Sequence, residues 1–359
     1  SFFLKRSQKI FLFLNKVIEQ YDNELSMPSS RFFNCLLIII GLLPFSSNLS
    51  YATSIEDTIP NNIIMYHRFG ETKYPSTNIT AEQLDSHLNY LMEQNYRFIQ
   101  ASDLLDPNQL NEKTITVTID DAYLSFYEVG LPMFEKYQVP VTLFLNTENV
   151  GGNNYMSWDQ LKDALNRGVE IQNHSHTHRS FATLDDENII SEIETSQSLI
   201  LANLNITPNL FAFPFGESSD AAQKIIETYF DAAFGQHSGA FSMNYRYYIP
   251  RYPLNENYSS IERLRDISKS LPFQAAQLQP SNPMLNPLST RFVLDIEEGV
   301  DGVNCFISDF QGSFEKQITV LENKLLIELS RMPVSGRLRF NCTKVDNGIF
   351  WYGHQYFVN

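Results

Sequence analysis

Short apolar runs alternate with amphipathic helical patterns between residues 62 and 272. The runs are rich in β-branched and aromatic residues, as expected of strands buried on both faces of a sheet. We expect six strands, at Ile63–Tyr66, Ile115–Ile119, Val141–Leu145, Val169–Gln172, Leu210–Phe213 and Ala232–Phe234. Helical patterns lie between them at residues 81–96, 157–168 and 185–204. This alternation predicts a mainly parallel α/β sheet.

Beyond residue 287 the hydrophobic period changes to two, which is typical of strands with one buried face. The pattern is clearest at residues 292–296, 303–307 and 338–342. A stretch rich in Pro, Asn and Gln precedes it at residues 273–287 and indicates a linker. We therefore predict an α/β domain over residues 53–272 and a small all-β sandwich over residues 288–359.

The N-terminal region has the composition of an export signal. A basic start at Arg31, an apolar run over residues 32–43 and a small-x-small site ending at Ala52 follow one another. We predict a signal peptide over residues 27–52, with an uncleaved anchor as the alternative. The apolar run is too short to favour a stable membrane span. Residues 1–26 precede Met27, and we expect them to be an upstream extension without function.

Export would place the chain in an oxidising compartment, either the periplasm or the extracellular space. Cys35 lies in the predicted signal peptide, so Cys305 and Cys342 have only one pairing. Both fall on the apolar face of a predicted sandwich strand. We expect them to form a disulfide bond within that domain.

The formal net charge is −15, and residues 1–52 carry five basic and three acidic side chains. The remaining chain therefore carries a net charge of −17. Such a surface argues against nucleic acid and anionic membranes as partners. It suits a neutral or partly cationic substrate.

Three polar clusters lie where predicted strands end, which is where α/β folds place their reactive loops. Asp120 and Asp121 close one strand, and His174 and His178 follow another. Residues 211–217, FAFPFGE, run from a strand into a loop whose backbone N–H groups could face an oxyanion. Taken singly, each cluster has a plain structural explanation, such as a helix cap or surface histidines. Taken together, they suggest one carboxylate that binds a metal and another that acts as a base.

In order and context these clusters resemble the polysaccharide deacetylase family, the NodB-type enzymes of carbohydrate esterase family four. The family motifs T-F-D-D-G, H-(S/T)-x-x-H and R-x-P-Y correspond here to Thr118–Ala122, His174–His178 and Ala212–Phe215. The resemblance covers residues 63–271 and implies a distorted (β/α) barrel. It also implies metal-dependent hydrolysis of acetamido groups on an extracytoplasmic polysaccharide, with release of acetate.

The resemblance further implies a role for each motif residue. Asp121, His174 and His178 would hold one divalent metal, with zinc expected and cobalt, nickel or iron compatible with these ligands. Asp120 would be the general base. The Phe215 backbone N–H would bind the tetrahedral oxyanion.

The chain departs from the family pattern at several positions. Ala122 replaces the motif glycine, which matters only if this residue needs a positive φ. Ala212 replaces the arginine that orients the base, and we expect Arg251 to take over that function. We group Arg251 with His67 and Pro214 as residues of the substrate-binding site.

The family's late Leu-x-His motif, which carries the general acid, has no clear counterpart. His237, just beyond a predicted strand, is our first candidate for that role, and His67 is the second. Two other functions fit the same pattern, a small-molecule amidohydrolase and a non-catalytic carbohydrate-binding protein. Because the three ligands and the base are all present, we favour an enzyme that acts on an acetylated polysaccharide.

Overall fold

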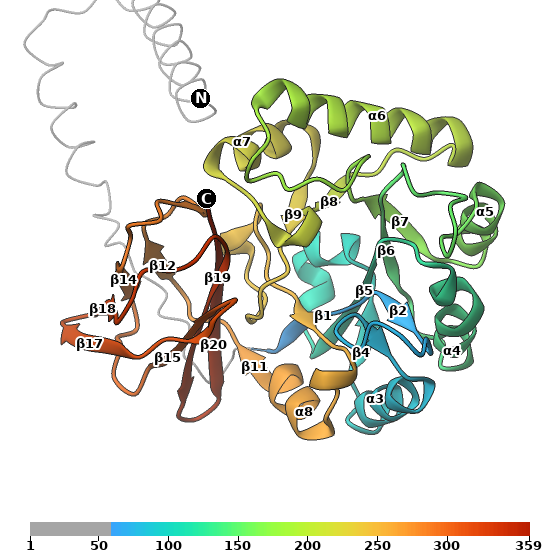
Figure 1. Cartoon of the computed structure of the whole chain (residues 1–359). Helices are drawn as coiled ribbons and strands as arrows, with labels where there is room; N and C mark the ends of the chain where they lie inside the picture. Colours follow the sequence, from blue (N-terminus) through green and yellow to red (C-terminus); the bar gives the residue numbers. More distant parts are fainter. Residues whose placement is uncertain (1–58) are drawn as a thin grey trace, which may run out of the picture. The chain divides into compact units, whose positions relative to one another are not determined.

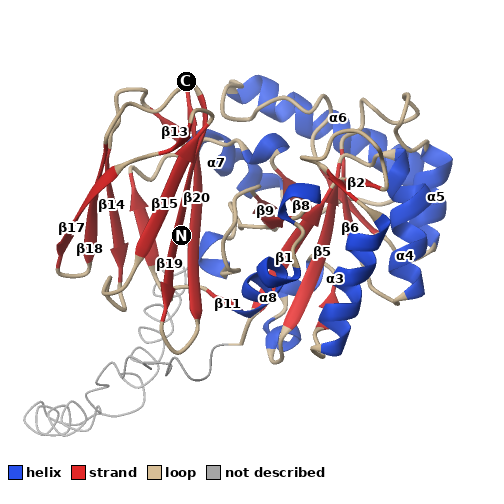
Figure 2. Ribbon diagram, turned by 60° about the horizontal axis from the view of Figure 1, so that its bottom comes forward, coloured by secondary structure: helices blue, strands red, loops and turns tan. Residues whose placement is uncertain are grey.

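The computed structural model describes residues 59–359. The predicted extension at residues 1–26, the signal peptide at residues 27–52 and Cys35 lie outside the described residues. Figures 1 and 2 show an α/β region followed by two β-sheets. Across the part that the structure describes, no helix combines the length and the apolar character needed to cross a membrane.

A parallel sheet forms the centre of the α/β region. Its strand order is β10-β1-β5-β6-β7-β8-β9, with β4 beside the first half of β5. The strands are β1 (Asn61–Tyr66), β4 (Arg97–Ile99), β5 (Thr114–Asp120), β6 (Thr142–Leu145), β7 (Glu170–Asn173), β8 (Leu210–Ala212), β9 (Ala232–Phe234) and β10 (Tyr252–Pro253). The six predicted strands are therefore confirmed, with ends displaced by at most two residues.

One irregular segment joins the two ends of this sheet. Ile249 forms a parallel bridge with Phe234 of β9, and Tyr252 of β10 pairs with Ile64 of β1. The circle of strands is thus closed through residues 249–253. This arrangement confirms the predicted distorted (β/α) barrel.

The helices connect successive strands, and Figure 1 shows α3, α4, α5 and α6 outside the barrel. They are α3 (Ala81–Glu93), α4 (Leu131–Lys136), α5 (Trp158–Asn166), α6 (Asp186–Leu204), α7 (Asp220–Tyr229) and α8 (Ile261–Lys269). Capping boxes begin two of them, with Thr80 and Gln83 at α3 and Ser157 and Gln160 at α5. A short parallel pair, β2 (Arg68–Phe69) and β3 (Asn78–Ile79), follows β1.

The C-terminal region consists of a six-stranded sheet and a four-stranded sheet. The larger contains β11 (Ser270–Leu271), β13 (Met284–Leu285), β15 (Asn304–Asp309), β16 (Gly312–Ser313), β19 (Gly336–Val345) and β20 (Ile349–Val358). The smaller contains β12 (Ala276–Gln279), β14 (Arg291–Ile296), β17 (Lys316–Leu321) and β18 (Lys324–Leu329). Alternate residues of β14 and β18 are buried in one apolar core, as the period of two predicts.

The structure corrects the linker predicted at residues 273–287. This stretch contains β12, which pairs with β14, and β13, which pairs with β20. The alternation of buried and exposed residues in β12 is only four residues long and is followed by a stretch with proline and asparagine. Composition therefore indicated a loop where tertiary packing imposes strands.

Cys305 of β15 and Cys342 of β19 lie directly opposite each other and form a disulfide bond. Both side chains are buried in the sandwich core. The pairing predicted from the sequence agrees with this arrangement.

Replacing Cys305 and Cys342 together by Ala is expected to lower the free energy of unfolding of the sandwich by roughly 2–4 kcal/mol. The two cysteines are 37 residues apart, so the crosslink shortens a substantial loop in the unfolded chain. Chemical denaturation of the oxidised protein and the double variant would measure the loss. Two free thiols in mass spectra of protein made under oxidising conditions would contradict the disulfide.

Candidate metal centre and active site

The candidate site lies where β5, β6 and β7 end. Asp121 follows β5 and His174 follows β7, so the two residues flank β6. The Asp121 N–H donates to the Phe144 carbonyl, and the His174 N–H donates to the Leu145 carbonyl. Because adjacent carbonyls of one strand hold both backbones, the sheet register places the two side chains together.

His178 reaches the same point by a tight turn. Its backbone N–H donates to the Ser175 hydroxyl, and the buried Glu192 of α6 accepts from the N–H groups of His176 and Thr177. The ring of His176 instead bonds the Thr147 hydroxyl, 2.8 Å away. The turn therefore directs His178 into the site and His176 away from it.

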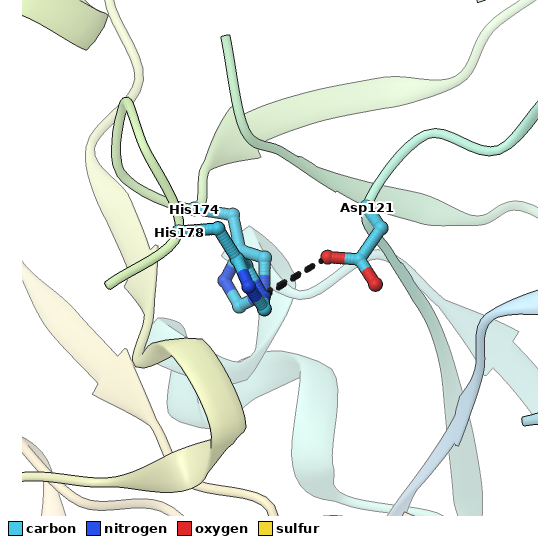
Figure 3. A group of neighbouring side chains, drawn as sticks. All are labelled: Asp121, His174 and His178. Atoms are coloured by element: carbon cyan, nitrogen blue, oxygen red, sulfur yellow. Dashed lines mark ion pairs between the residues drawn. The ribbon is translucent and has the colours of Figure 1, made fainter. Parts of the chain in front are cut away.

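The three predicted ligands converge in Figure 3. Asp121 Oδ1 lies 3.1 Å from His178 Nε2 and 3.6 Å from His174 Nε2. Their donor atoms all lie within 4.8 Å of one another. Tetrahedral zinc at about 2.0–2.1 Å from each ligand would separate neighbouring donor atoms by about 3.4 Å. The donor set and its spacing therefore fit a divalent metal.

The orientation of His174 supports the same conclusion. Its Nδ1–H donates to the Ala212 carbonyl at 2.7 Å, which leaves the Nε2 lone pair directed at the site. This Nε2 is buried and has no hydrogen-bond partner. Burial lowers the pKa of His174 to about 4, even though the nearby Asp120 carboxylate raises it. A neutral imidazole with an unpartnered inner nitrogen is the form that binds metal.

Asp121 is held ionised in a buried position. Burial alone would raise its pKa, but the hydrogen bond and the charge of His178 lower it overall. Asn146, directly after β6, donates to Asp121 Oδ1 at 3.0 Å, and Asn149 donates in turn to Asn146 at 3.0 Å. Sequence analysis missed both asparagines, although the position of Asn146 at a strand end was a usable signal.

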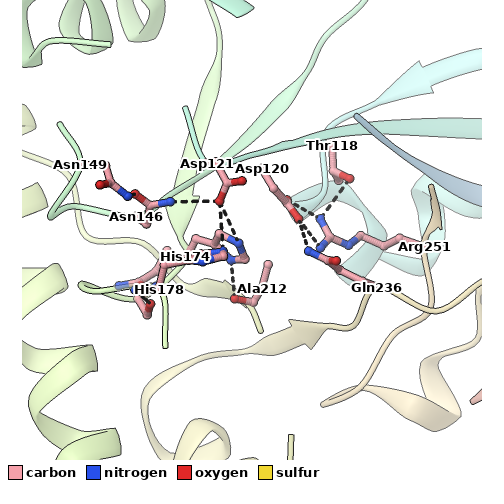
Figure 4. A network of polar contacts seen from close by, with 12 residues as sticks. Thr118, Asp120, Asp121, Asn146, Asn149, His174, His178, Ala212, Gln236 and Arg251 are labelled. Carbon is pink, nitrogen blue, oxygen red and sulfur yellow. Dashed lines mark hydrogen bonds and ion pairs between the residues drawn. The ribbon is translucent and has the colours of Figure 1, made fainter. Parts of the chain in front are cut away.

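Asp120 points away from the metal ligands and toward Arg251, as Figure 4 shows. Arg251 Nη1 and Nη2 lie 2.7 and 2.8 Å from the two carboxylate oxygens, and both residues are completely buried. Gln236, also missed by sequence analysis, donates to Asp120 Oδ2 at 3.3 Å. Burial would raise the pKa of Asp120, but the charge of Arg251 and its hydrogen bonds lower it overall. Arg251 thus stands where the missing motif arginine would act.

The structure corrects part of the predicted substrate-binding group. Arg251 is buried and directs both Nη atoms at the Asp120 carboxylate, so its contact is with the base and not with a substrate. Pro214 is buried as well. His67 remains half-buried beyond β1, where its charge lowers the pKa of both Asp120 and Asp121.

His237 lies away from the metal ligands. Its ring contacts Tyr248 at 4.6 Å and faces His354 at 6.1 Å, and all three residues line a cavity of about 350 Å³ beside the sandwich. The structure therefore brings His67, and not His237, into electrostatic range of the two aspartates. In the sequence His237 follows a strand, as the catalytic loops do, but its side chain faces Tyr248 and the cavity beside the sandwich.

Backbone strain is concentrated in the loops of the site. Left-handed backbone costs a residue other than glycine roughly 1–2 kcal/mol. The non-glycine residues with positive φ here are Asp121 (76°), Ala122 (57°), Ser175 (69°), His178 (57°) and Phe215 (59°). Ala122 therefore adopts the conformation for which the family motif uses glycine. Such strain persists only where the surrounding structure enforces it.

Removing one imidazole should abolish metal binding. Purified protein is expected to carry about one divalent ion per chain, and His174→Ala should lose it. His176→Ala is the matched control, because its ring bonds Thr147 and lies outside the ligand set. Burial would lower the pKa of His178, but the hydrogen bond and the charge of Asp121 raise it overall, so protons should compete and weaken metal binding as the pH falls. Equal metal content in the two variants, measured by elemental analysis, would reject the assignment.

Residues 108–229 match the family model for Polysaccharide deacetylase. The chain is 22% identical over 217 residues to the poly-β-1,6-N-acetyl-D-glucosamine N-deacetylase of Staphylococcus aureus, covering 55% of this chain and 74% of that protein. It is also 22% identical over 169 residues to YxkH of Bacillus subtilis, provisionally named a polysaccharide deacetylase. That match covers 46% of this chain and spans 60% of the length of YxkH.

Two solved structures share the fold of the barrel. The Streptococcus pyogenes deacetylase PplD, solved in complex with acetate, superimposes with a TM-score of 0.55 at 21% identity. The superposition covers 59% of this chain and 99% of PplD. A de-N-acetylase from Aggregatibacter actinomycetemcomitans gives a TM-score of 0.52 at 16% identity, over 58% of this chain and 99% of that protein.

Proposed function

We propose that this chain, which belongs to the polysaccharide deacetylase family through residues 108–229, hydrolyses acetamido groups on a polysaccharide and releases acetate. One observation carries the proposal. Asp121, His174 and His178 converge as a ligand set, while the neighbouring Asp120 stays outside it and is paired with Arg251. In metal-dependent amide hydrolysis, the divalent metal activates the water and the carbonyl, and a separate base accepts the proton of the water.

Each residue near the site has a part in the proposed reaction. A divalent ion in the ligand set would supply Lewis-acid activation. Asp120 accepts the proton of the attacking water, and Arg251 keeps its carboxylate ionised and oriented. Asn146 fixes the Asp121 carboxylate so that one oxygen faces both histidines.

The remaining two roles concern the oxyanion and the leaving group. The Phe215 N–H binds the developing oxyanion, and the Phe215 ring, 4.5 Å from that of His178, covers one side of the ligand set. His67 replaces His237 as the general acid that protonates the leaving amine. Its position just beyond β1, where its charge lowers the pKa of both aspartates, supports this assignment.

The substrate that we propose first is a polymer of β-1,6-linked N-acetylglucosamine, because a relative that covers 55% of this chain is named for that activity. We also propose zinc as the metal and a location outside the cytoplasm. Imidazole and carboxylate ligands support zinc, and the buried disulfide supports an oxidising compartment.

Acetate release from defined glycans tests this function. Oligomers of β-1,6- and β-1,4-linked N-acetylglucosamine and intact peptidoglycan would be incubated with the protein before and after chelation, and again after zinc is restored. We expect acetate from at least one glycan, loss after chelation and recovery with zinc. Failure of metal-loaded protein to release acetate from any of them would overturn the proposal.

A further inference from the structure

Strand β20 of the sandwich contacts the loop of the third motif. The Gln355 side chain is completely buried, and its Nε2 donates to the carbonyls of Phe215 at 3.0 Å and Gly216 at 2.9 Å. Both N–H groups of this amide are therefore used on two successive carbonyls of one loop. The contact joins positions 140 and 139 residues apart in the chain.

The loop that accepts these bonds has a strained backbone. Phe215 and Gly216 are both left-handed, with φ of 59° and 65°. A Cβ at Gly216 would lie 2.4 Å from the Gln236 backbone nitrogen, so the loop is pressed against the segment after β9. The Tyr248 hydroxyl lies 2.6 Å from the Gly216 carbonyl and supplies a second polar contact. Glycine tolerates this conformation, but Phe215 needs such outside support, because without it the residue would relax to another conformation.

The Gln355 amide is itself fixed in place. Its Oε1 accepts from Arg339 Nε at 3.4 Å, and Arg339 is its partner across β19 and β20. Strand β20 is also anchored to the barrel, because the Ala240 N–H donates to the Trp351 carbonyl. Gly353 packs so closely that an added Cβ would lie 1.5 Å from the Ser238 carbonyl oxygen. The donor therefore sits on a strand that has little freedom to shift.

We propose that Gln355 is a positioning residue that holds the Phe215–Gly216 loop in its left-handed conformation, so that the sandwich completes the active site. The proposal rests on the proposed function, in which the Phe215 N–H binds the oxyanion. Gln355 acts only through that loop, since its amide bonds the carbonyl side of the backbone. Correct aim of the N–H requires that the peptide planes around Phe215 be fixed.

The test replaces Gln355 by Met, which keeps the length of the side chain and removes both donors. The variant should lose about tenfold to a hundredfold in kcat, since a displacement of about 1 Å near the reacting atoms can have that effect. KM and metal content should stay close to wild type, because the loop contains no metal ligand. The backbone amides of Gly216 and Glu217, which donate to the Phe213 and Pro214 carbonyls, should also exchange faster with deuterated water.

Ile307→Val is the matched control. It removes one methyl group from the sandwich core without touching the loop, so it lowers Tm but leaves kcat per metal-loaded molecule and loop exchange unchanged. If Gln355→Met does not fold, Tyr248→Phe keeps the ring and removes the hydroxyl contact with Gly216. It should give a smaller change in exchange in the same direction.

The outcomes separate this proposal from the function on which it rests. An active wild type with unchanged kcat and loop exchange in Gln355→Met would overturn the role of Gln355. Faster loop exchange in the variant, together with a metal-loaded wild type that releases acetate from none of the oligomers and not from peptidoglycan, would uphold the positioning and overturn the deacetylase function. Equal losses of kcat in Gln355→Met and Ile307→Val would overturn the positioning role and leave Gln355 only a general part in stabilising the sandwich.

Discussion

Asp120→Asn is expected to lower turnover by about a hundred- to ten-thousand-fold, because no group then accepts the proton of the attacking water. Metal content should not change, since the Asp120 carboxylate faces Arg251 and lies outside the ligand set. Turnover should be expressed per metal-loaded molecule, because the substitution also leaves a buried guanidinium without its counter-charge. Acetate release and elemental analysis of the same samples give both quantities.

The neighbouring variant Asp121→Asn is the matched comparison, because it makes the same chemical change one residue along the chain. It should weaken metal binding, and excess metal should restore part of its activity. The opposite pattern, with metal lost from Asp120→Asn and kept by Asp121→Asn, would invert the two assignments. Wild-type metal content and wild-type turnover in both variants would show that neither residue takes part in the mechanism.

Breaking the pair of Asp120 and Arg251 from either side is expected to cost about 3–5 kcal/mol in the free energy of unfolding. Both side chains are fully buried and joined by two hydrogen bonds, so each single variant leaves an unpaired group inside the protein. The double variant Asp120→Asn/Arg251→Met removes both charges. It should therefore lose far less than the sum of the two single changes.

The coupling is measured by guanidinium chloride denaturation of the wild type, the two single variants and the double variant, monitored by a spectroscopic signal of the barrel. The exposed pair of Lys136 and Asp85, 2.9 Å apart, provides the control cycle. Its coupling should be only about 0.2–1 kcal/mol, because solvent screens exposed charges. Additive losses at Asp120 and Arg251 would show that the guanidinium does not stabilise the carboxylate, and another residue would then have to orient the base.

Much of the barrel and the ligand set could be predicted because local signals agree with the tertiary structure there. Strands buried on both faces appear as short apolar runs, and the polar residues that end them meet at one edge of the sheet. His174 and Asp121 each follow such a run. Their convergence then follows from the strand order, with β6 between them.

The residues that sequence analysis missed or misplaced depend on contacts distant in the chain. His237 follows a barrel strand as the catalytic loops do, but its ring packs on Tyr248, so position at a strand end did not determine orientation. Gln236 and Gln355 are amides without a local pattern, and only folding brings them to Asp120 and Phe215. The same reason explains β12, whose four residues become a strand only beside β14.

The closing segment at residues 249–253 links the integrity of the barrel to its chemistry. Arg251 lies between Ile249, which bridges β9, and Tyr252, which pairs with β1. Local opening of this closing segment would withdraw the Arg251 guanidinium from Asp120 while the rest of the sheet stays folded. Heating or denaturant should then abolish deacetylase activity at a lower temperature or denaturant concentration than the one that unfolds the protein. Residual activity therefore reports whether the closing segment at residues 249–253 is in place.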